Sequence, residues 1–139
     1  MEQMNELEYL NSLDQRESEI VKLYEEYLDL LKKDLVSQNL SKKTMDRTLH
    51  RAEEFLFGYL NYDEPLTIEQ GVHHVYHFLF THAPNKFYAS FDKITEYATA
   101  VKKLYVCLHR HGYVSDDELS FVLNDIKVSV ADLRADLNE

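Results

Sequence analysis

Apolar residues recur three and four positions apart along most of the chain, which is the spacing of one face of an α-helix. The clearest such stretch runs from Ser90 to Gly112, with apolar positions at Phe91, Ile94, Ala98, Val101, Tyr105 and Leu108. Ser90 is suited to cap the first turn, and Gly112 to adopt the left-handed conformation that often follows a last turn. The pattern predicts a helix whose apolar face, widened by Tyr97 and Leu104, contacts several neighbours.

The same spacing predicts four further helices. Their expected ranges are 16–38, 41–60, 67–82 and 115–133. Residues 83–86 are expected to form a turn, the tail over 134–139 is expected to fray, and residues 1–15 are expected to form only a short or frayed helix. Thr67–Gln70 and Ser115–Glu118 have the form of capping boxes, which mark the starts of two of these helices. Pro84 is expected to end the third helix, because proline lacks the backbone N–H that a helix interior needs.

The predicted fold is all-α, a compact bundle of about five helices. Only 3 glycines and 2 prolines occur in 139 residues, which favours long helices over many short strands. No repeat, low-complexity segment or long linker divides the chain, so we expect one domain over 1–139. Its helical core would span residues 16–137, with residues 1–15 as an N-terminal extension.

The composition indicates a soluble, cytoplasmic protein. The formal net charge of −10 favours solubility and disfavours indiscriminate binding to phosphate or anionic membranes. The single cysteine, Cys107, cannot form an internal disulfide and is expected to be a structural thiol in a reducing compartment. No apolar stretch approaches the ~20 residues that span a bilayer, and the acidic N-terminus does not resemble a signal peptide. We therefore expect no membrane association.

Two segments of the chain resemble a known family. One is the helix introduced by NLSKKT (39–44), with Phe55 and Tyr59–Leu60 later in it, and the other is KKLYVCLHRHG (102–112) followed by Val114–Ser115. Their order resembles the N-terminal core-binding, SAM-like domain of phage integrases and tyrosine recombinases, over roughly residues 20–127. The chain looks closer still to short, acidic bacterial proteins that carry this domain alone.

The resemblance implies a SAM-like helical fold in which the helices over 41–60 and 90–111 approach the major groove of DNA. The His-x-x-Arg motif of the recombinase catalytic domain occurs nowhere in the chain. Recombinase chemistry is therefore excluded within this sequence, and the resemblance implies a binding module and not an enzyme.

Positive charge gathers on the same two predicted helices. Residues 42–51 carry a net charge of +3 and residues 102–111 another +3, so the rest of the chain sums to −16. Lysine and arginine contacts to phosphate are the general source of nucleic-acid affinity. The candidate DNA-binding residues are Lys42, Lys43, Arg47, Arg51, Lys102, Lys103 and Arg110. The alternative interpretation is a solvated helix face, with Lys102–Arg110 complementing a helix C-terminus.

Four histidines between residues 73 and 82 raise the question of a metal site. His73 and His77 are four apart and share a helical face, as in one class of zinc site. No glutamate follows His73 in the manner of His-Glu-x-x-His, and the chain has no pair of cysteines that could supply further zinc ligands. We interpret these histidines as solvated or packed residues and predict no metal and no other cofactor.

The sequence shows no constellation typical of catalysis. Its paired acids, such as Glu25–Glu26, are neighbours in sequence, and helical neighbours point about 100° apart. There is no nucleophile–base pair and no glycine-rich phosphate loop, so we predict no catalytic residues and no small-molecule substrate. Two hypotheses stay open: a DNA-binding or DNA-associated accessory protein, and an acidic protein-interaction or self-association module without a nucleic-acid role.

Overall fold

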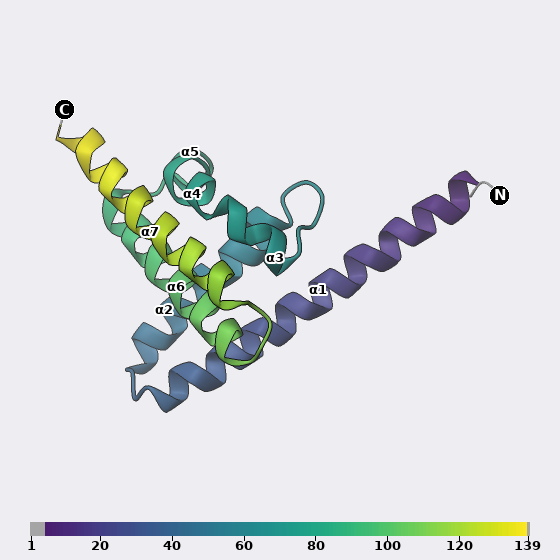
Figure 1. Ribbon diagram of the computed structural model, residues 1–139, viewed down its shortest axis with the longest axis horizontal. Helices are drawn as coiled ribbons and strands as arrows, with labels where there is room; N and C mark the ends of the chain where they lie inside the picture. The colour runs from purple at the N-terminus through teal and green to yellow at the C-terminus, as the bar shows by residue number, and fades with distance from the viewer. Residues whose placement is uncertain (1–4, 139) are drawn as a thin grey trace.

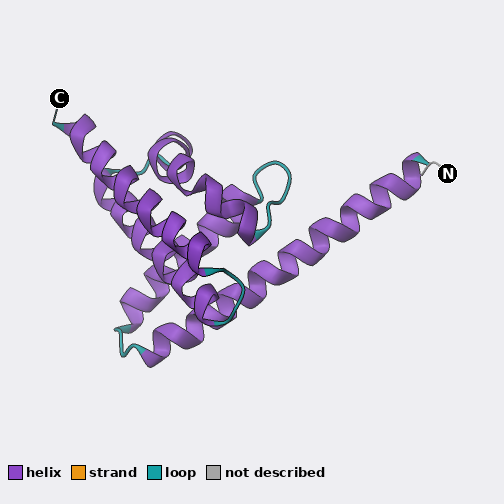
Figure 2. Ribbon diagram, in the orientation of Figure 1, coloured by secondary structure: helices purple, strands orange, loops and turns teal. Residues whose placement is uncertain are grey.

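The computed structural model describes residues 5–138, and all regular secondary structure in this range is helical (Figure 1, Figure 2). The all-α prediction is therefore confirmed. Five continuous helical segments follow one another. They are α1 (Glu6–Ser37); α2 (Lys42–Glu53) with η1 (Glu54–Leu60); α3 (Ile68–Gly71), η2 (Val72–His74), α4 (Val75–His77), η3 (Phe78–His82) and α5 (Ala83–Lys86); α6 (Phe91–Arg110); and α7 (Asp116–Leu137).

The helix starts follow the predicted caps. The side chains of Ser41, Thr67, Ser90 and Ser115 each accept a hydrogen bond from the backbone N–H three residues later. The capping boxes at Thr67 and Ser115 are both complete, which satisfies backbone donors that a helix start leaves free. Gly112 has a φ of 85°, the left-handed conformation that glycine adopts without steric cost.

The first helix differs from its prediction. α1 begins at Glu6 after a capping box between Asn5 and Glu8, and it continues without a break to Ser37. Its first part, residues 6–15, extends away from the rest of the molecule, and we call this part the arm (Figure 1). The prediction of a separate short or frayed helix over 1–15 is wrong for residues 6–15, because the cap and the good helix formers after it continue the helix. Residues 1–4 lie outside the described range.

The third segment also differs from its prediction. Pro84 does not end the helix, because Ala83–Lys86 form a further helical turn. The turn before it, η3, is a π-helix, in which hydrogen bonds run from residue i to i+5. This wider turn, together with the position of Pro84 in the first turn of α5, accommodates a residue without an N–H.

α6 lies at the centre of the packing. It contacts α1, α2 and α7, and in Figure 1 it runs between α2 and α7. The buried core is rich in aromatic rings, of which the largest fully buried are Tyr24, Tyr97, Tyr105, Phe55 and Phe78. Two buried tyrosine hydroxyls bind backbone carbonyls: Tyr105 donates to the Ile68 carbonyl at 3.0 Å, and Tyr24 donates to the Leu66 carbonyl. The helix ranked first by its sequence pattern is therefore the one around which the others pack.

Glycine appears where helices approach closely. A Cβ added at Gly71 would lie 2.7 Å from the Tyr105 hydroxyl, and one added at Gly58 would lie 3.1 Å from the Phe87 ring.

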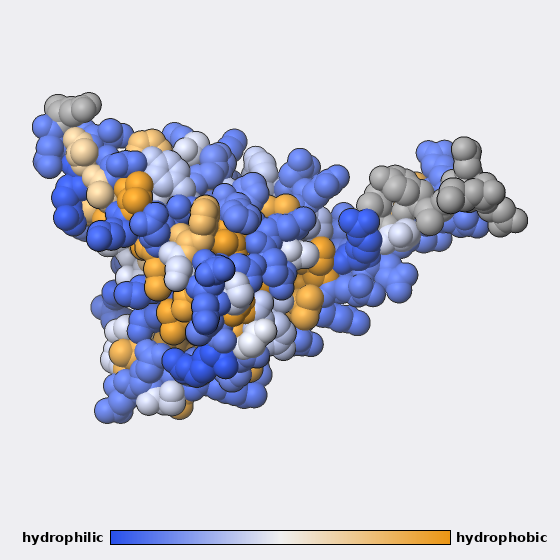
Figure 3. Space-filling model, in the orientation of Figure 1, coloured by the Kyte–Doolittle hydropathy of each residue, from blue (hydrophilic) through white to orange (hydrophobic). Residues whose placement is uncertain are grey.

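On the face shown in Figure 3, the visible surface of the arm is mostly hydrophilic, whereas apolar residues gather over the body of the molecule. Within residues 5–138, no helix carries a stretch that is both long and apolar enough to cross a membrane.

Candidate nucleic-acid interface

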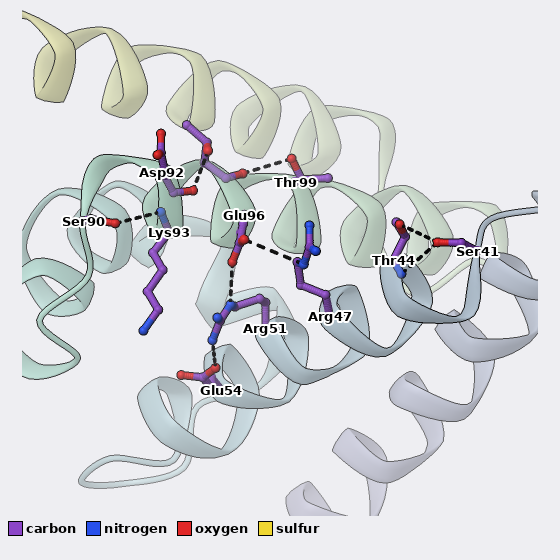
Figure 4. Close-up of polar contacts among 11 residues, drawn as sticks. Ser41, Thr44, Arg47, Arg51, Glu54, Ser90, Asp92, Lys93, Glu96 and Thr99 are labelled. Carbon is purple, nitrogen blue, oxygen red and sulfur yellow. Dashed lines mark hydrogen bonds and ion pairs between the residues drawn. The ribbon is translucent and has the colours of Figure 1, made fainter.

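The two basic segments found in the sequence lie on helices that pack side by side. α2 contacts α6, and the C-terminal end of α1 lies beside both helices (Figure 4). Lys103 donates from Nζ to the side-chain oxygen of Gln38 at 3.0 Å, which links α6 to the connection between α1 and α2. The fold thereby brings residues of 42–51 and of 102–110 to one region of the surface.

Lys42 and Lys43 are exposed in the first turn of α2. A helix N-terminus carries partial positive charge and favours acidic side chains, but the first turn of α2 contains none. These lysines therefore do not stabilise their own helix electrostatically, and their presence there needs another explanation.

The two arginines of α2 have different surroundings. Arg47 is exposed, and its Nε lies 3.7 Å from a carboxylate oxygen of Glu96 in α6. Arg51 is only 15% exposed, and its guanidinium donates to Glu54 at 2.5 Å and to Glu96 at 3.2 Å (Figure 4). Burial by itself would lower the pKa of Arg51, but the hydrogen bonds to the two carboxylates outweigh it and raise that pKa.

Arg51 therefore belongs to the packing between helices. Its guanidinium also lies over the Tyr97 ring, 5.0 Å from the ring centre. Arg51, a candidate DNA-binding residue on sequence grounds, is instead surrounded by carboxylates of both helices and by an aromatic face. The helical spacing could not reveal this, since it does not identify the charges on the neighbouring helix.

On α6, Lys102 is exposed, and Lys103 and Arg110 contact residues of the α1 end. Arg110 donates from Nη1 to Oδ2 of Asp34 at 2.9 Å. The Arg110 side chain is 56% exposed, so solvent screens its attraction to Asp34 and this ion pair is worth at most about 1 kcal/mol.

Four of the candidate side chains, Arg47, Lys102, Lys103 and Arg110, line two adjoining hollows. The smaller, of about 160 Å³, is lined by Thr44, Arg47, Thr48, Thr95, Glu96 and Thr99. The larger, of about 360 Å³, is lined by Asp34, Gln38, Thr99, Lys102, Lys103, Val106 and Arg110. Because Thr99 lines both, the hollows form one surface over α1, α2 and α6. The neutral and acidic residues of this surface were not predicted from the sequence, because they come from helix faces that no motif marks.

The four histidines between residues 73 and 82 do not share one site. His73 packs edge-on against Phe121, and the His77 ring nitrogen lies 2.7 Å from the Tyr59 hydroxyl. His82 is buried among aromatic rings, and its Nε2 has no hydrogen-bond partner among the described residues. His74 is exposed. Their different surroundings fit the interpretation as packed or solvated residues.

No model of a protein family, no curated protein and no solved structure matches the chain. The resemblance to the core-binding domain of tyrosine recombinases therefore stays a prediction from the sequence.

Proposed function

We propose that this chain is a non-catalytic helical module that binds DNA through a basic face. The face consists of Lys42, Lys43, Arg47, Lys102, Lys103 and Arg110. The observation that carries the proposal is that two basic segments far apart in sequence border one continuous pair of hollows over α1, α2 and α6. Arg51, a candidate on sequence grounds, is left out because Glu54 and Glu96 already bind it.

The charges of the face support a phosphate-binding role. The chain has a formal net charge of −10, so six cations on one surface contrast with the rest of the molecule. Among the described residues, Lys42, Lys43 and Lys102 form no ion pair, which leaves them free to contact phosphate. Asp34 and Glu96 lie in the same hollows and oppose a polyanion, so we expect weak binding at physiological salt.

The test is binding of a fluorescent duplex DNA, followed by anisotropy over a series of salt concentrations. If each of the six cations neutralises one phosphate, log affinity against log salt should fall with a slope no steeper than about −5.4. The double variant Lys43→Glu/Lys102→Glu should lose measurable binding, because both residues are exposed and adding acids there reverses local charge.

Lys127→Glu is the matched control. Lys127 is exposed on α7, a helix that carries none of the six cations of the face, so its reversal should leave DNA affinity nearly unchanged. Circular dichroism should give the same helicity for all three proteins. No binding by the wild type at low salt, or equal binding by the double variant, would show that the proposal is wrong.

A second candidate function, self-association, is favoured by the arm. Leu7 is 68% exposed and Leu10 is 50% exposed, on a part of α1 that extends away from the body. The arm is also acidic, because it carries Glu6, Glu8 and Asp14 and neither lysine nor arginine. A second copy of the chain offers a basic face complementary to it.

Sedimentation equilibrium at low and high salt tests this second candidate. We expect a dimer at low salt that dissociates at high salt, and weaker association for Leu7→Ser/Leu10→Ser. A monomer at every concentration and salt would exclude it.

A further inference from the structure

Three metal-ligating side chains of different chemistry meet at the junction of α1 and α6. Asp34 comes from α1, Cys107 from α6, and His111 caps the C-terminus of α6. One carboxylate oxygen, the thiol sulfur and one imidazole nitrogen all lie within 4.8 Å of one another. Among residues 5–138, this is the only such group of three or more histidine, cysteine, aspartate or glutamate side chains.

The donor set and its spacing suit zinc. Cys107 and His111 are four positions apart, so both side chains lie on the side of α6 that faces Asp34. Zinc binds sulfur, nitrogen and oxygen, and with Zn–N and Zn–O bonds of about 2.1 Å two tetrahedral ligands lie about 3.4 Å apart. His111 Nε2 lies 3.8 Å from Asp34 Oδ1, which is too long for a hydrogen bond but close to that spacing.

The Asp34 carboxylate is oriented for this role. Its Oδ2 accepts a hydrogen bond from Arg110 at 2.9 Å, while its Oδ1 is the oxygen nearer His111. Carboxylates that bind metals commonly hold such a second partner, which fixes their orientation. The Asp34 side chain is only 14% exposed, so it does not rotate freely in solvent.

Cys107 contributes a buried sulfur. The residue is 1% exposed. An incoming Zn²⁺ ion would form a Zn–S bond in place of the S–H bond, whose proton would leave to solvent. His111 is exposed and gives the ion a route to the sulfur.

We propose that Asp34, Cys107 and His111 bind one Zn²⁺ ion, with water in the fourth position. The inference stands independently of the ligand of the basic face. The expectation of no metal rested on the histidines at 73–82, which lack further ligands with zinc-site spacing. The spacing Cys107-x-x-x-His111 was the available signal, but its partner Asp34 lies in a helix distant in sequence.

Cobalt titration of the purified chain tests the site. Co²⁺ replaces Zn²⁺ in such sites and gives a thiolate-to-cobalt absorption band in the near ultraviolet, so the band reports sulfur ligation directly. We expect the band with wild type and its loss on adding Zn²⁺. Cys107→Ser should lack the band, and His111→Ala should bind cobalt at least about tenfold more weakly, because even outer partners of metal ligands contribute that much.

His109→Ala is the control, because His109 lies two positions from both ligands and pairs instead with Asp116. Its cobalt affinity should equal that of the wild type. If Cys107→Ser fails to fold, the cobalt affinity of His111→Ala still tests the site, because His111 is exposed and its truncation should leave the protein folded. Absence of the band in the wild type, unchanged affinity in His111→Ala, or an equal loss in His109→Ala would overturn the proposal.

Discussion

α6 and the arm of α1 are both helices with good caps, but they lie in opposite surroundings. α6 buries a wide face and contacts α1, α2 and α7. The arm carries leucines at positions 7 and 10, and both are exposed. The spacing of apolar residues thus predicts that a helix forms, and the partner that covers it depends on the rest of the fold.

The arm is helical for a reason that differs from that of α6. An isolated helix of this length is marginal in water because nucleation is costly. The arm continues a helix whose later residues Tyr24, Tyr27 and Leu31 are buried, so the nucleus already exists. Its own capping box at Asn5 and Glu8 then stabilises the free end. Packing against other helices stabilises α6, whereas the arm is stabilised by its continuity with the buried part of α1 and by its capping box.

The largest expected effect is in the centre of α6. Leu104→Ala should lower the free energy of unfolding by about 2–5 kcal/mol, because a fully buried side chain leaves a cavity between helices. Val101→Ala should cost less, since fewer atoms are removed. Both effects can be measured as shifts of the denaturant midpoint, provided that the dependence of the free energy of unfolding on denaturant concentration is unchanged. A Leu104→Ala midpoint equal to that of the wild type would mean that α6 is peripheral.

A smaller effect is expected where α6 meets the third helical segment. Tyr105→Phe removes the hydroxyl that donates to the Ile68 carbonyl at 3.0 Å. The buried acceptor then lacks its partner, which should cost about 1–3 kcal/mol in the same denaturant measurement. The aromatic ring remains, so helicity should not change. A variant as stable as the wild type would show that water replaces the hydroxyl there.

The third prediction concerns pH and the buried His82. Burial, followed by the nearby positive charges of His77 and Lys86, lowers the pKa of His82 below its ordinary value. The unfolded chain therefore takes up a proton near pH 6.5 that the folded chain does not, so this contribution to stability is present above about pH 6.5 and is lost as pH falls below it.

His82→Phe isolates this contribution. The ring of His82 lies among Tyr59, Tyr62 and Phe87, and its Nε2 has no hydrogen-bond partner in the described chain, so phenylalanine suits the same surroundings. Denaturant titrations between about pH 7.5 and 5.5 should show the stability of the wild type falling relative to that of the variant. A constant difference across this range would contradict the assignment.

The sequence predicts the helices well because caps and apolar spacing are local. Ser41, Thr67, Ser90 and Ser115 mark their helix starts correctly. The continuation of the third helix through Pro84 was missed, because the π-helical turn before it depends on packing that propensity does not describe.

The candidate sites could be predicted less completely, since they depend on contacts between helices. The pairing of Arg51 with Glu96 and of Arg110 with Asp34 joins residues far apart in sequence. Charge patterning along one helix identified the basic residues of the face, but it could not identify the carboxylates that a neighbouring helix places beside them.

The smallest expected effect is on the arm. Leu10→Ala should change the free energy of unfolding by less than about 0.5 kcal/mol, because the side chain is 50% exposed and packs against no core element. Leu31→Ala is the matched control: it makes the same change in the same helix at a residue 1% exposed, and should cost about 2–5 kcal/mol. Hydrogen exchange should likewise be faster in the arm than around Leu31. Leu10→Ala shifting the midpoint as far as Leu31→Ala would mean that something covers the arm in solution. Because self-association depends on concentration, repeating the measurement after dilution would then show whether the cover is a second copy of the chain.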